Sequence, residues 1–428
     1  MFWNEKMETL HGHALEELQL KRLKETISRT QNVGFYKKMF KDAGITPSDI
    51  RSLDDLHKIP FTKKADLRNG YPFGFLAVPM NQVNRIHTTS GTTGKPTVVA
   101  YTKNDLNTWS DLIARNLTMV GLKAGDIFQN ASNYSLFTGG LGIHMGAEKI
   151  GCAVVPSGVG NTKRQIEMIQ DFGVTGLHCT PSYAMHLTEV AEEMHANLES
   201  LKVGCFGAEA WSENMRRDLQ NRLGLKAYDS YGMSELFGPG VAFECPEQNG
   251  LHIWHDCYIV EIIDPKTGEN LGPGEKGELV VTPIMKEAMP FLRYRTGDIT
   301  MLMEDECPCG RGQKIARLLG RSDDMLTIRG INVFPSQIEH ALKNIPEVGD
   351  QFMVYVDRVN YQDELTIEVE MNKNVFSGEL KDLSNLQTKI VKALQDTLSL
   401  RASVELVEPG SLPRFEGKAK RVIDRRVI

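Results

Sequence analysis

The sequence has little of what marks several common classes of protein. Its 428 residues include seven cysteines, too few and too scattered for a disulfide framework, which favours a reducing, cytoplasmic setting. No run of 18 or more apolar residues occurs, so no membrane-spanning helix is expected. The first residues are partly charged and lack the apolar stretch of a signal peptide. The formal net charge of −6 argues against a nucleic-acid partner, since nucleic-acid binders usually carry a basic excess.

The first part of the chain is expected to be helical. A hydrophobic content of 41% is ample for a large core, and the length predicts two or three domains. Leu15, Leu18, Leu23 and Ile27 lie at helical spacing among charged residues, and further helices are expected over 33–43 and from Asp55. Residues 1–80 are therefore predicted to form a helical subdomain.

The middle of the chain alternates short apolar strands with helical segments. Strands are expected at 153–155, 176–178 and 203–206, and such alternation favours α/β layers with parallel pairing. From about Leu251 the sequence becomes β-rich and is interrupted by Gly and Pro, which predicts an antiparallel or barrel-like subdomain at about 245–322. Residues 81–322 thus complete a large α/β domain.

The last hundred residues predict a separate small α+β domain, residues 323–428. Strands are expected near 352–356 and 365–371, the second with apolar residues alternating on one face. A helix at about 380–398 and a strand at 404–407 follow.

A loop rich in Gly and Thr, TTSGTTGKP at residues 88–96, is the most informative local feature. Glycines let backbone N–H groups turn toward an anion, hydroxyls add donors, and Lys95 supplies a charge for phosphate oxygens. The spacing is not that of the Walker loop, because two residues separate Gly91 from Gly94 and Pro96 follows the lysine. The loop therefore predicts a phosphate site of another class, with a solvated turn as the alternative.

The loop resembles the phosphate loop of the acyl-adenylate-forming superfamily, which includes acyl-CoA synthetases, peptide-synthetase adenylation domains and luciferases. Other motifs of that superfamily follow in its order. They are Tyr231–Glu235, Tyr294–Asp298, the hinge motif Gly320–Gly330 and Gly417–Lys418. Two local signatures, Tyr71–Gly74 and Gly330–Pro335, resemble the phenylacetate–CoA ligases, and the resemblance covers nearly the whole chain.

This resemblance implies a ligase that uses ATP, Mg²⁺ and coenzyme A. An aryl acid, phenylacetate above all, would attack the α-phosphate of ATP, and the CoA thiol would then displace AMP from the acyl-adenylate. The acid is already ionised at neutral pH, so the first step needs no general base. The alternatives are another acid, an amine or carrier acceptor, adenylylation of a deazaflavin coenzyme, or a non-catalytic nucleotide sensor. A homodimer is typical of the family.

The resemblance also implies roles for individual residues. Lys418, Glu235 and Lys95 would be catalytic, with Glu235 as the Mg²⁺ ligand; Lys420 is the alternative to Lys418 if the register of the tail shifts. Asp323 would be the hinge about which the small domain rotates, and Gly330 would approach CoA. The expected ATP-binding residues are Thr88, Thr89, Ser90, Gly91, Thr92, Thr93, Gly94, Ala208, Glu209, Asp229, Tyr231, Gly232, Met233, Asp298 and Arg321.

The acyl pocket is expected between the motifs. Two aromatics beside glycines would form a flat slot for a ring. The expected pocket residues are Tyr134, Phe137, Gly139, Ala208 and Pro239.

Four residues outside these motifs suggest a second site. Cys245 and His252 precede Cys307 and Cys309, and three cysteines with one histidine make an accepted structural zinc set. The Cys-x-Cys spacing is tighter than usual. The alternatives are free thiols, or His255 or Cys257 in place of His252.

Overall fold

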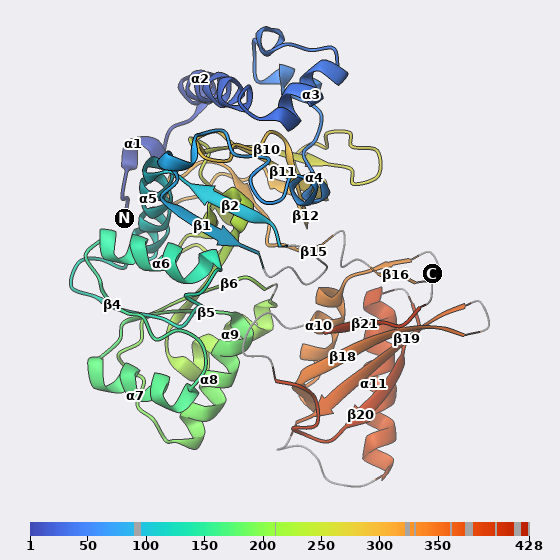
Figure 1. The fold of residues 1–428 in the computed structure, drawn as a ribbon. Coiled ribbons are helices and arrows are strands. Elements are labelled where there is room, and N and C mark those ends of the chain that lie inside the picture. Colours follow the sequence, from blue (N-terminus) through green and yellow to red (C-terminus); the bar gives the residue numbers. More distant parts are fainter. Residues whose placement is uncertain are drawn as a thin grey trace. The chain divides into compact units, whose positions relative to one another are not determined.

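The chain forms two compact units in the computed structural model (Figure 1). The structure describes residues 1–89, 96–209, 211–321, 326–328, 331–359, 362–372, 380–398, 400–414 and 421–426. The first unit comprises Met1–Cys179, Glu189–Ala208 and Gly224–Arg317. The second unit comprises Thr180–Thr188, Glu209–Leu223 and Leu318–Ile428.

A nine-stranded sheet organises the first unit, in the order β13-β14-β9-β8-β7-β6-β5-β3-β4. Strands β4, β3, β5, β6 and β7 pair in parallel, and β8, β9, β14 and β13 extend the sheet with antiparallel pairs. The strands are β3 (Ile127–Asn130), β4 (Ala153–Val155), β5 (Gly176–Cys179), β6 (Val203–Gly207), β7 (Lys226–Met233), β8 (Gly238–Glu244), β9 (Leu251–Ile253), β13 (Leu302–Met303) and β14 (Lys314–Ile315).

The predicted strands at 153–155, 176–178 and 203–206 are confirmed, as is their parallel pairing. All residues of β5 and β6 are buried, which explains why these strands read as continuous apolar runs without alternation. Parallel strands place their carboxyl ends at one edge of the sheet, and ligands of open α/β sheets bind outside that edge.

Antiparallel strands complete the first unit. Strand β10 (Tyr258–Ile263) pairs with β11 (Gly277–Pro283), which pairs with β12 (Tyr294–Thr300). The β-rich region expected from the sequence is thus confirmed as antiparallel. A separate pair, β1 (Arg85–Thr88) and β2 (Val98–Tyr101), flanks the Gly- and Thr-rich loop.

The start of helix α5 (Lys103–Met119) is set by a side-chain cap in the sequence. Thr102 and Asp105 form a capping box at the start of α5, which packs against α6 and β8. The helix predicted near Asp55 is a 3₁₀ helix, η2. The helices are α1 (Glu5–Glu8), α2 (Gly12–Thr30), α3 (Gly34–Asp42), α4 (Lys64–Asn69), α5 (Lys103–Met119), α6 (Thr138–Lys149) and α7 (Thr162–Phe172), with 3₁₀ turns η1 (Pro47–Asp49), η2 (Asp54–Lys58), η3 (Met80–Gln82) and η4 (Ser234–Leu236).

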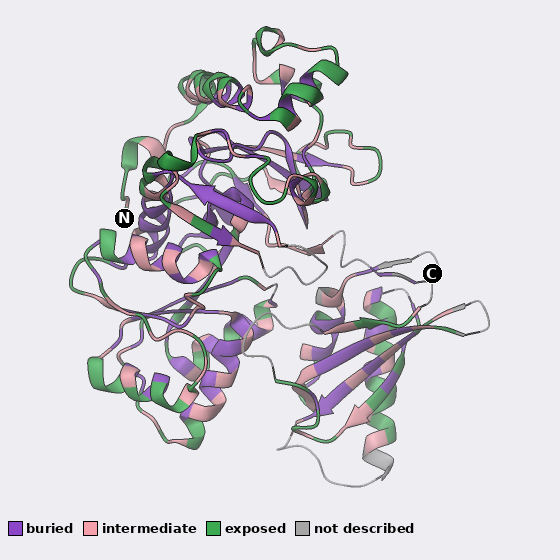
Figure 2. Cartoon of the chain, viewed as in Figure 1, coloured by how far each residue is buried: buried purple, intermediate pink, exposed green. Residues whose placement is uncertain are grey.

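A four-stranded sheet in the order β20-β19-β18-β21 forms the centre of the second unit. Its apolar face is buried against α10 and α11, as the purple strands in Figure 2 show. The predicted alternation holds, because Leu365, Ile367 and Val369 are all buried. The elements are β15 (Gly320–Arg321), β16 (Leu326–Ile328), β17 (Ile331–Val333), α10 (Pro335–Lys343), β18 (Val348–Val359), β19 (Gln362–Met371), α11 (Leu380–Leu398), β20 (Ser403–Val407) and β21 (Val422–Asp424).

Two further helices, α8 (Pro181–Glu193) and α9 (Glu213–Leu223), follow β5 and β6 in the chain. The fold expected from the sequence, α/β layers with a β-rich region and a small α+β part, is the fold observed. No helix in the described ranges is long and apolar enough to cross a membrane.

Candidate active site and candidate metal centre

The ends of the Gly- and Thr-rich loop are fixed by two neighbouring antiparallel strands. Thr88 is the last residue of β1, and its N–H donates to the carbonyl of Leu136 at 3.0 Å. Thr89 and Thr97 face each other, with the Thr97 N–H donating to the Thr89 hydroxyl at 3.0 Å. The predicted phosphate residues Ser90, Gly91, Thr92, Thr93, Gly94 and Lys95 lie outside the described residues.

Two predicted nucleotide residues from different sheets meet in the first unit. The hydroxyl of Tyr231, on β7, donates to the carboxylate of Asp298, on β12, at 2.6 Å. Both side chains are buried, and the N–H of Asp298 donates to the Thr296 hydroxyl at 3.0 Å. Because a hydrogen bond to a carboxylate is stronger than one between neutral groups, this contact fixes the direction in which the carboxylate faces.

The neighbouring predicted residues lie at the carboxyl ends of β6 and β7. Ala208 follows β6 with a positive φ of 70°, and Glu209 accepts a hydrogen bond from the N–H of Ser182 at 3.2 Å. The carboxylate of Asp229 accepts from Arg317 at 2.9 Å, a partner that sequence reasoning missed. A Cβ on Gly232 would meet the carbonyl oxygen of Gly238 at 2.3 Å, so this position requires glycine. Met233 pairs with Gly238 across β7 and β8.

Glu235 lies in η4, the turn that joins β7 to β8. Its side chain is 3% exposed, and the hydroxyl of Tyr294 donates to its Oε1 at 3.3 Å. In the part of the chain that the structure describes, no Lys or Arg nitrogen forms an ion pair with this carboxylate. A buried carboxylate without a cationic side chain at its oxygens fits a Mg²⁺ ligand, since Mg²⁺ prefers one or two carboxylates together with phosphate and water. Tyr294 opens the third sequence motif but carried no predicted role.

The predicted acyl-pocket residues come from the loop before α6, the first turn of α6, the end of β6 and β8. The hydroxyl of Tyr134 accepts from Asn130 at 2.8 Å and lies 3.1 Å from Nδ1 of His144. Burial raises the pKa of Tyr134 to about 12, so this hydroxyl stays protonated. Phe137 is 38% exposed and precedes the first turn of α6, which contains Gly139.

Two glycines in that turn differ in the space around them. A Cβ on Gly140 would lie 2.5 Å from the carbonyl oxygen of Asn133, whereas one on Gly139 would meet nothing closer than 3.9 Å. Pro239 lies on β8, where its carbonyl accepts from Trp109 at 2.8 Å. Thr138 and Ser234 are hydroxyl partners at 3.1 Å, which links the start of α6 to the Glu235 turn.

The remaining predicted residues belong to the second unit. Arg321 is half-buried on β15. Asp323, Gly330, Lys418 and the alternative Lys420 lie outside the described residues.

Four predicted metal ligands come together in the first unit. Ligand atoms of Cys245, His252, Cys307 and Cys309 all lie within 4.8 Å of one another. Cys245 follows β8, His252 lies on β9, and the two other cysteines lie between β13 and β14. The adjacency of β8, β9, β14 and β13 in one sheet brings these distant segments together.

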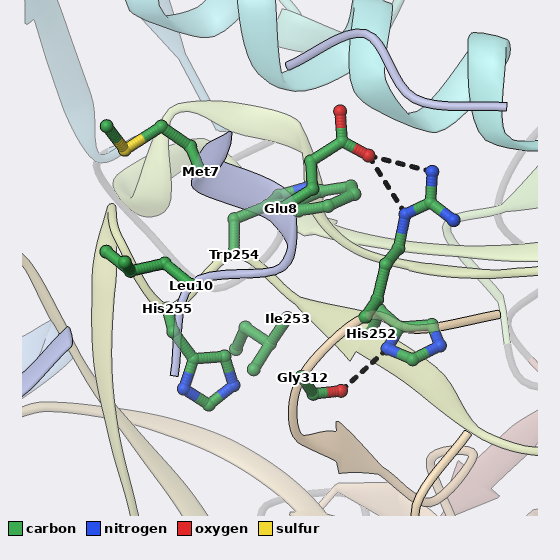
Figure 3. Close-up of a pocket in the computed structure, with 9 residues that line it drawn as sticks. Met7, Glu8, Leu10, His252, Ile253, Trp254, His255 and Gly312 are labelled. Carbon is green, nitrogen blue, oxygen red and sulfur yellow. Dashed lines mark hydrogen bonds and ion pairs between the residues drawn. The ribbon is translucent and has the colours of Figure 1, made fainter. Parts of the chain in front are cut away.

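The donor geometry of this cluster matches zinc chemistry. The sulfurs of Cys245 and Cys307 are 3.6 Å apart, and two sulfurs on one tetrahedral zinc would be about 3.8 Å apart. Nε2 of His252 lies 3.2 Å from the sulfur of Cys309, while its Nδ1 bonds the carbonyl of Gly312 at 2.8 Å (Figure 3). Such a carbonyl partner fixes the orientation of the ring, with Nε2 toward the sulfur of Cys309.

The cysteines form the tight knuckle that the sequence suggested. The N–H of Gly310 donates to the carbonyl of Cys307 at 2.9 Å, which closes the turn that carries both thiols. The side chains of Cys245 and His252 lower the pKa of Cys309 and favour its thiolate. The other candidate ligands lie outside the cluster. Burial lowers the pKa of His255 to about 4, and Cys257 instead donates to Asp256.

The N-terminal segment is attached to the same knuckle. Arg311 donates to the carboxylate of Glu8 at 2.9 Å and to the carbonyl of Met1 at 2.6 Å. Arg311 and Glu8 are both buried, and these two side chains line the small pocket in Figure 3 with His252 and His255. The cluster therefore joins the N-terminus, β8, β9 and the loop before β14.

Comparison with known proteins identifies the family. Residues 44–284 match the AMP-binding enzyme family, and residues 330–426 match the AMP-binding enzyme C-terminal domain. The phenylacetate–coenzyme A ligase of Thermus thermophilus is 44% identical, with complete coverage of both chains. The corresponding ligase of Aromatoleum evansii is 46% identical over 99% of this chain and 97% of its own.

The fold has a solved counterpart. A 2-hydroxyisobutyryl-CoA ligase, in the postadenylation state in complex with R3-HIB-AMP, superposes with a TM-score of 0.93. It is 30% identical, and the match covers 99% of this chain and 92% of that one. With its ordered motifs, its fold and its full-length relatives, this chain belongs to the AMP-binding enzymes and, among them, to the phenylacetate–coenzyme A ligase family.

Proposed function

We propose that this chain ligates phenylacetate to coenzyme A through an acyl-adenylate, with release of pyrophosphate and AMP. The observation that carries the proposal is the meeting of the second and third motifs in one buried site. There Tyr231 donates to Asp298, and Tyr294 donates to Glu235. These four residues come from two segments distant in the sequence. The proposal is also supported by relatives that are 44–46% identical over nearly the whole chain and are phenylacetate–coenzyme A ligases.

The chain's own residues position the reactants of the first step. The carboxylate of Asp298 accepts hydrogen bonds from the hydroxyls of the ribose, and Tyr231 holds that carboxylate in place. Thr88, Thr89 and the loop that follows bind the β- and γ-phosphates. A Mg²⁺ ion held by Glu235 would neutralise phosphate charge. Lys418 would reach the α-phosphate and the attacking carboxylate, and this positioning replaces general-base catalysis.

The second step requires a different arrangement of the same chain. We place the hinge at Asp323, with Gly330 beside the CoA arm, and domain boundaries at residues 80 and 322. The acyl ring would lie near Tyr134, Phe137 and Pro239. We also propose one structural zinc on the four-residue cluster, a homodimer, a cytoplasmic setting, and no nucleic-acid partner.

Pyrophosphate exchange into ATP tests the proposed function. With phenylacetate we expect strong exchange without CoA, and phenylacetyl-CoA once CoA is added. Benzoate, indoleacetate and short aliphatic acids serve as comparisons, since one methylene changes pocket affinity by only ~1–3 kcal/mol. Absence of exchange with every acid would contradict the proposed ligase activity. Nucleotide binding without turnover of any acid would then favour a deazaflavin-adenylylating enzyme or a nucleotide sensor.

The Tyr231→Phe variant tests the ribose site. Removing the hydroxyl takes one buried donor from the Asp298 carboxylate, a loss of ~1.5–3 kcal/mol for a hydrogen bond to a charged group. We expect the KM for ATP to rise about 10- to 100-fold, with the KM for the acid unchanged. Tyr36→Phe is the matched control, because that hydroxyl is also buried but bonds Thr62 and Leu292. An unchanged KM for ATP in Tyr231→Phe would contradict the role of Tyr231 in ribose binding.

A further inference from the structure

Buried side chains hold the turn that carries Glu235. We name this segment, Ser234–Phe237, the Glu235 turn; its last residue has a positive φ of 87°. The hydroxyl of Tyr101 lies 3.2 and 3.1 Å from the carbonyl oxygens of the first and fourth residues of the turn. The hydroxyl of Tyr258 donates to the carbonyl of the third residue at 2.9 Å. Tyrosine hydroxyls thus lie at hydrogen-bond distance from three of the four carbonyls, two of which share the single proton of Tyr101.

The remaining carbonyl, that of Glu235 itself, accepts from a lysine. Lys286 has 0% exposure, and its Nζ donates to this oxygen at 2.8 Å. Three rings surround the ammonium group, with centroids at 5.0 Å for Tyr101, 5.6 Å for Phe237 and 5.2 Å for Phe291. Attraction to ring faces and to the carbonyl offsets part of the cost of burying this charge.

The segment that carries this lysine is itself fixed to the start of α5. The buried carboxylate of Asp105 accepts from the N–H groups of Glu287 at 2.7 Å and Ala288 at 2.9 Å. Burial lowers the pKa of Lys286 to about 8, while the charges of Asp105 and Glu235 act in the opposite direction and favour its ammonium form. An apolar side chain would fill the same aromatic cage without desolvating a charge, so packing alone does not account for a lysine here.

We propose that Lys286 is a positioning residue that holds Glu235 through its main-chain carbonyl, and so leaves the Glu235 carboxylate free to bind the Mg²⁺ of ATP. This inference rests on the proposed function, in which Glu235 is the Mg²⁺ ligand. The division of contacts supports it, because the lysine holds the backbone, and among the described residues the hydroxyl of Tyr294 is the hydrogen-bond partner of the carboxylate. Lys286 touches neither substrate nor metal in this role.

The Lys286→Met variant keeps the length of the side chain and removes its donor and its charge. Mn²⁺ affinity is measured by electron paramagnetic resonance with ATP present and acid absent, so that no turnover occurs. We expect the Mn²⁺ dissociation constant to rise about tenfold. The KM for Mg²⁺ in pyrophosphate exchange should rise by a similar factor, while the KM for the acid stays unchanged.

Lys314→Met is the matched control. Lys314 is 2% exposed and pairs with Asp305 at 2.7 Å, so the variant loses a buried ammonium group away from the Glu235 turn. A fall in melting temperature in both variants, with a loss of metal affinity in Lys286→Met alone, supports the proposal. Metal affinity within twofold of the unchanged protein in Lys286→Met overturns it.

Two further variants keep the test decisive. Glu235→Gln should weaken Mn²⁺ binding more strongly than Lys286→Met. If it does not, both the metal role of Glu235 and this inference fail; if it does and Lys286→Met does not, only this inference fails. Should Lys286→Met not fold, Lys286→Gln shortens the side chain by one atom, removes its charge and withdraws the donor from the Glu235 carbonyl, while the surrounding rings remain. It should weaken Mn²⁺ binding at least about threefold, and affinity within twofold of the unchanged protein would overturn the proposal.

Discussion

Lys418→Ala is expected to slow pyrophosphate exchange about 100- to 1,000-fold while leaving ATP binding within a few-fold of its original value. The lysine would contribute its charge mainly as negative charge develops on the α-phosphate and the attacking carboxylate. Loss of one such preorganised donor commonly costs ~3–4 kcal/mol in the transition state. Formation of phenylacetyl-CoA from chemically supplied phenylacetyl-adenylate should persist, because that step no longer needs the adenylating lysine.

Lys420→Ala is the matched control for this variant. It removes a second lysine two positions along the same basic tail, and it is expected to retain exchange. If Lys420→Ala loses exchange and Lys418→Ala keeps it, the register of the tail is shifted and Lys420 is the adenylation lysine. Retention of exchange in both variants would contradict a role for either lysine in the first step.

Purified protein is expected to carry one zinc ion per chain, and Cys309→Ser is expected to lose it. The cluster joins β8, β9 and the loop before β14, so its loss should lower the free energy of unfolding by more than about 4 kcal/mol. Metal analysis and urea denaturation measure the two effects. Metal-ligating thiols must be deprotonated, so this stability should be present at neutral pH and be lost as the pH falls and zinc is released.

Cys152→Ser is the control for the zinc prediction. Cys152 is also buried, but its thiol lies 3.5 Å from the carbonyl of Lys123 and outside the cluster. This variant should keep its zinc and most of its stability. A protein that contains only trace zinc, with equal stability in Cys309→Ser and Cys152→Ser, would show the cluster to be four unligated side chains.

Local sequence patterns predicted most secondary structure because those patterns are short-range. Strands such as 153–155 and 203–206 consist of apolar residues between turn signals, and their bounds match the structure closely. The alternation at Leu365, Ile367 and Val369 identified the buried face of β19, because a strand has a period of two. No comparably strong sequence pattern distinguishes the 3₁₀ helix near Asp55 from an α-helix.

Contacts between distant segments could not be predicted in the same way. The sequence favoured His252 but left His255 as an alternative, and the pairing of β9 with β14 decides that His252 lies with the three sulfurs. No sequence pattern identified Arg317, because its partner Asp229 lies 88 residues away in the chain. Such partners become visible only when strand order fixes which ends of the chain lie side by side.

The sequence by itself determined the family, the α/β layers and the motif residues expected to bind nucleotide, because glycines, hydroxyls and charges at fixed spacing already specify that chemistry. Tertiary structure alone decided that Tyr231 supports Asp298, that Tyr294 faces Glu235, and that Lys286 holds the Glu235 turn from within an aromatic cage. The physical reason is burial. A hydrogen bond or a charge acquires its large effect only where water is excluded, and the packing of segments distant in the sequence determines where that occurs.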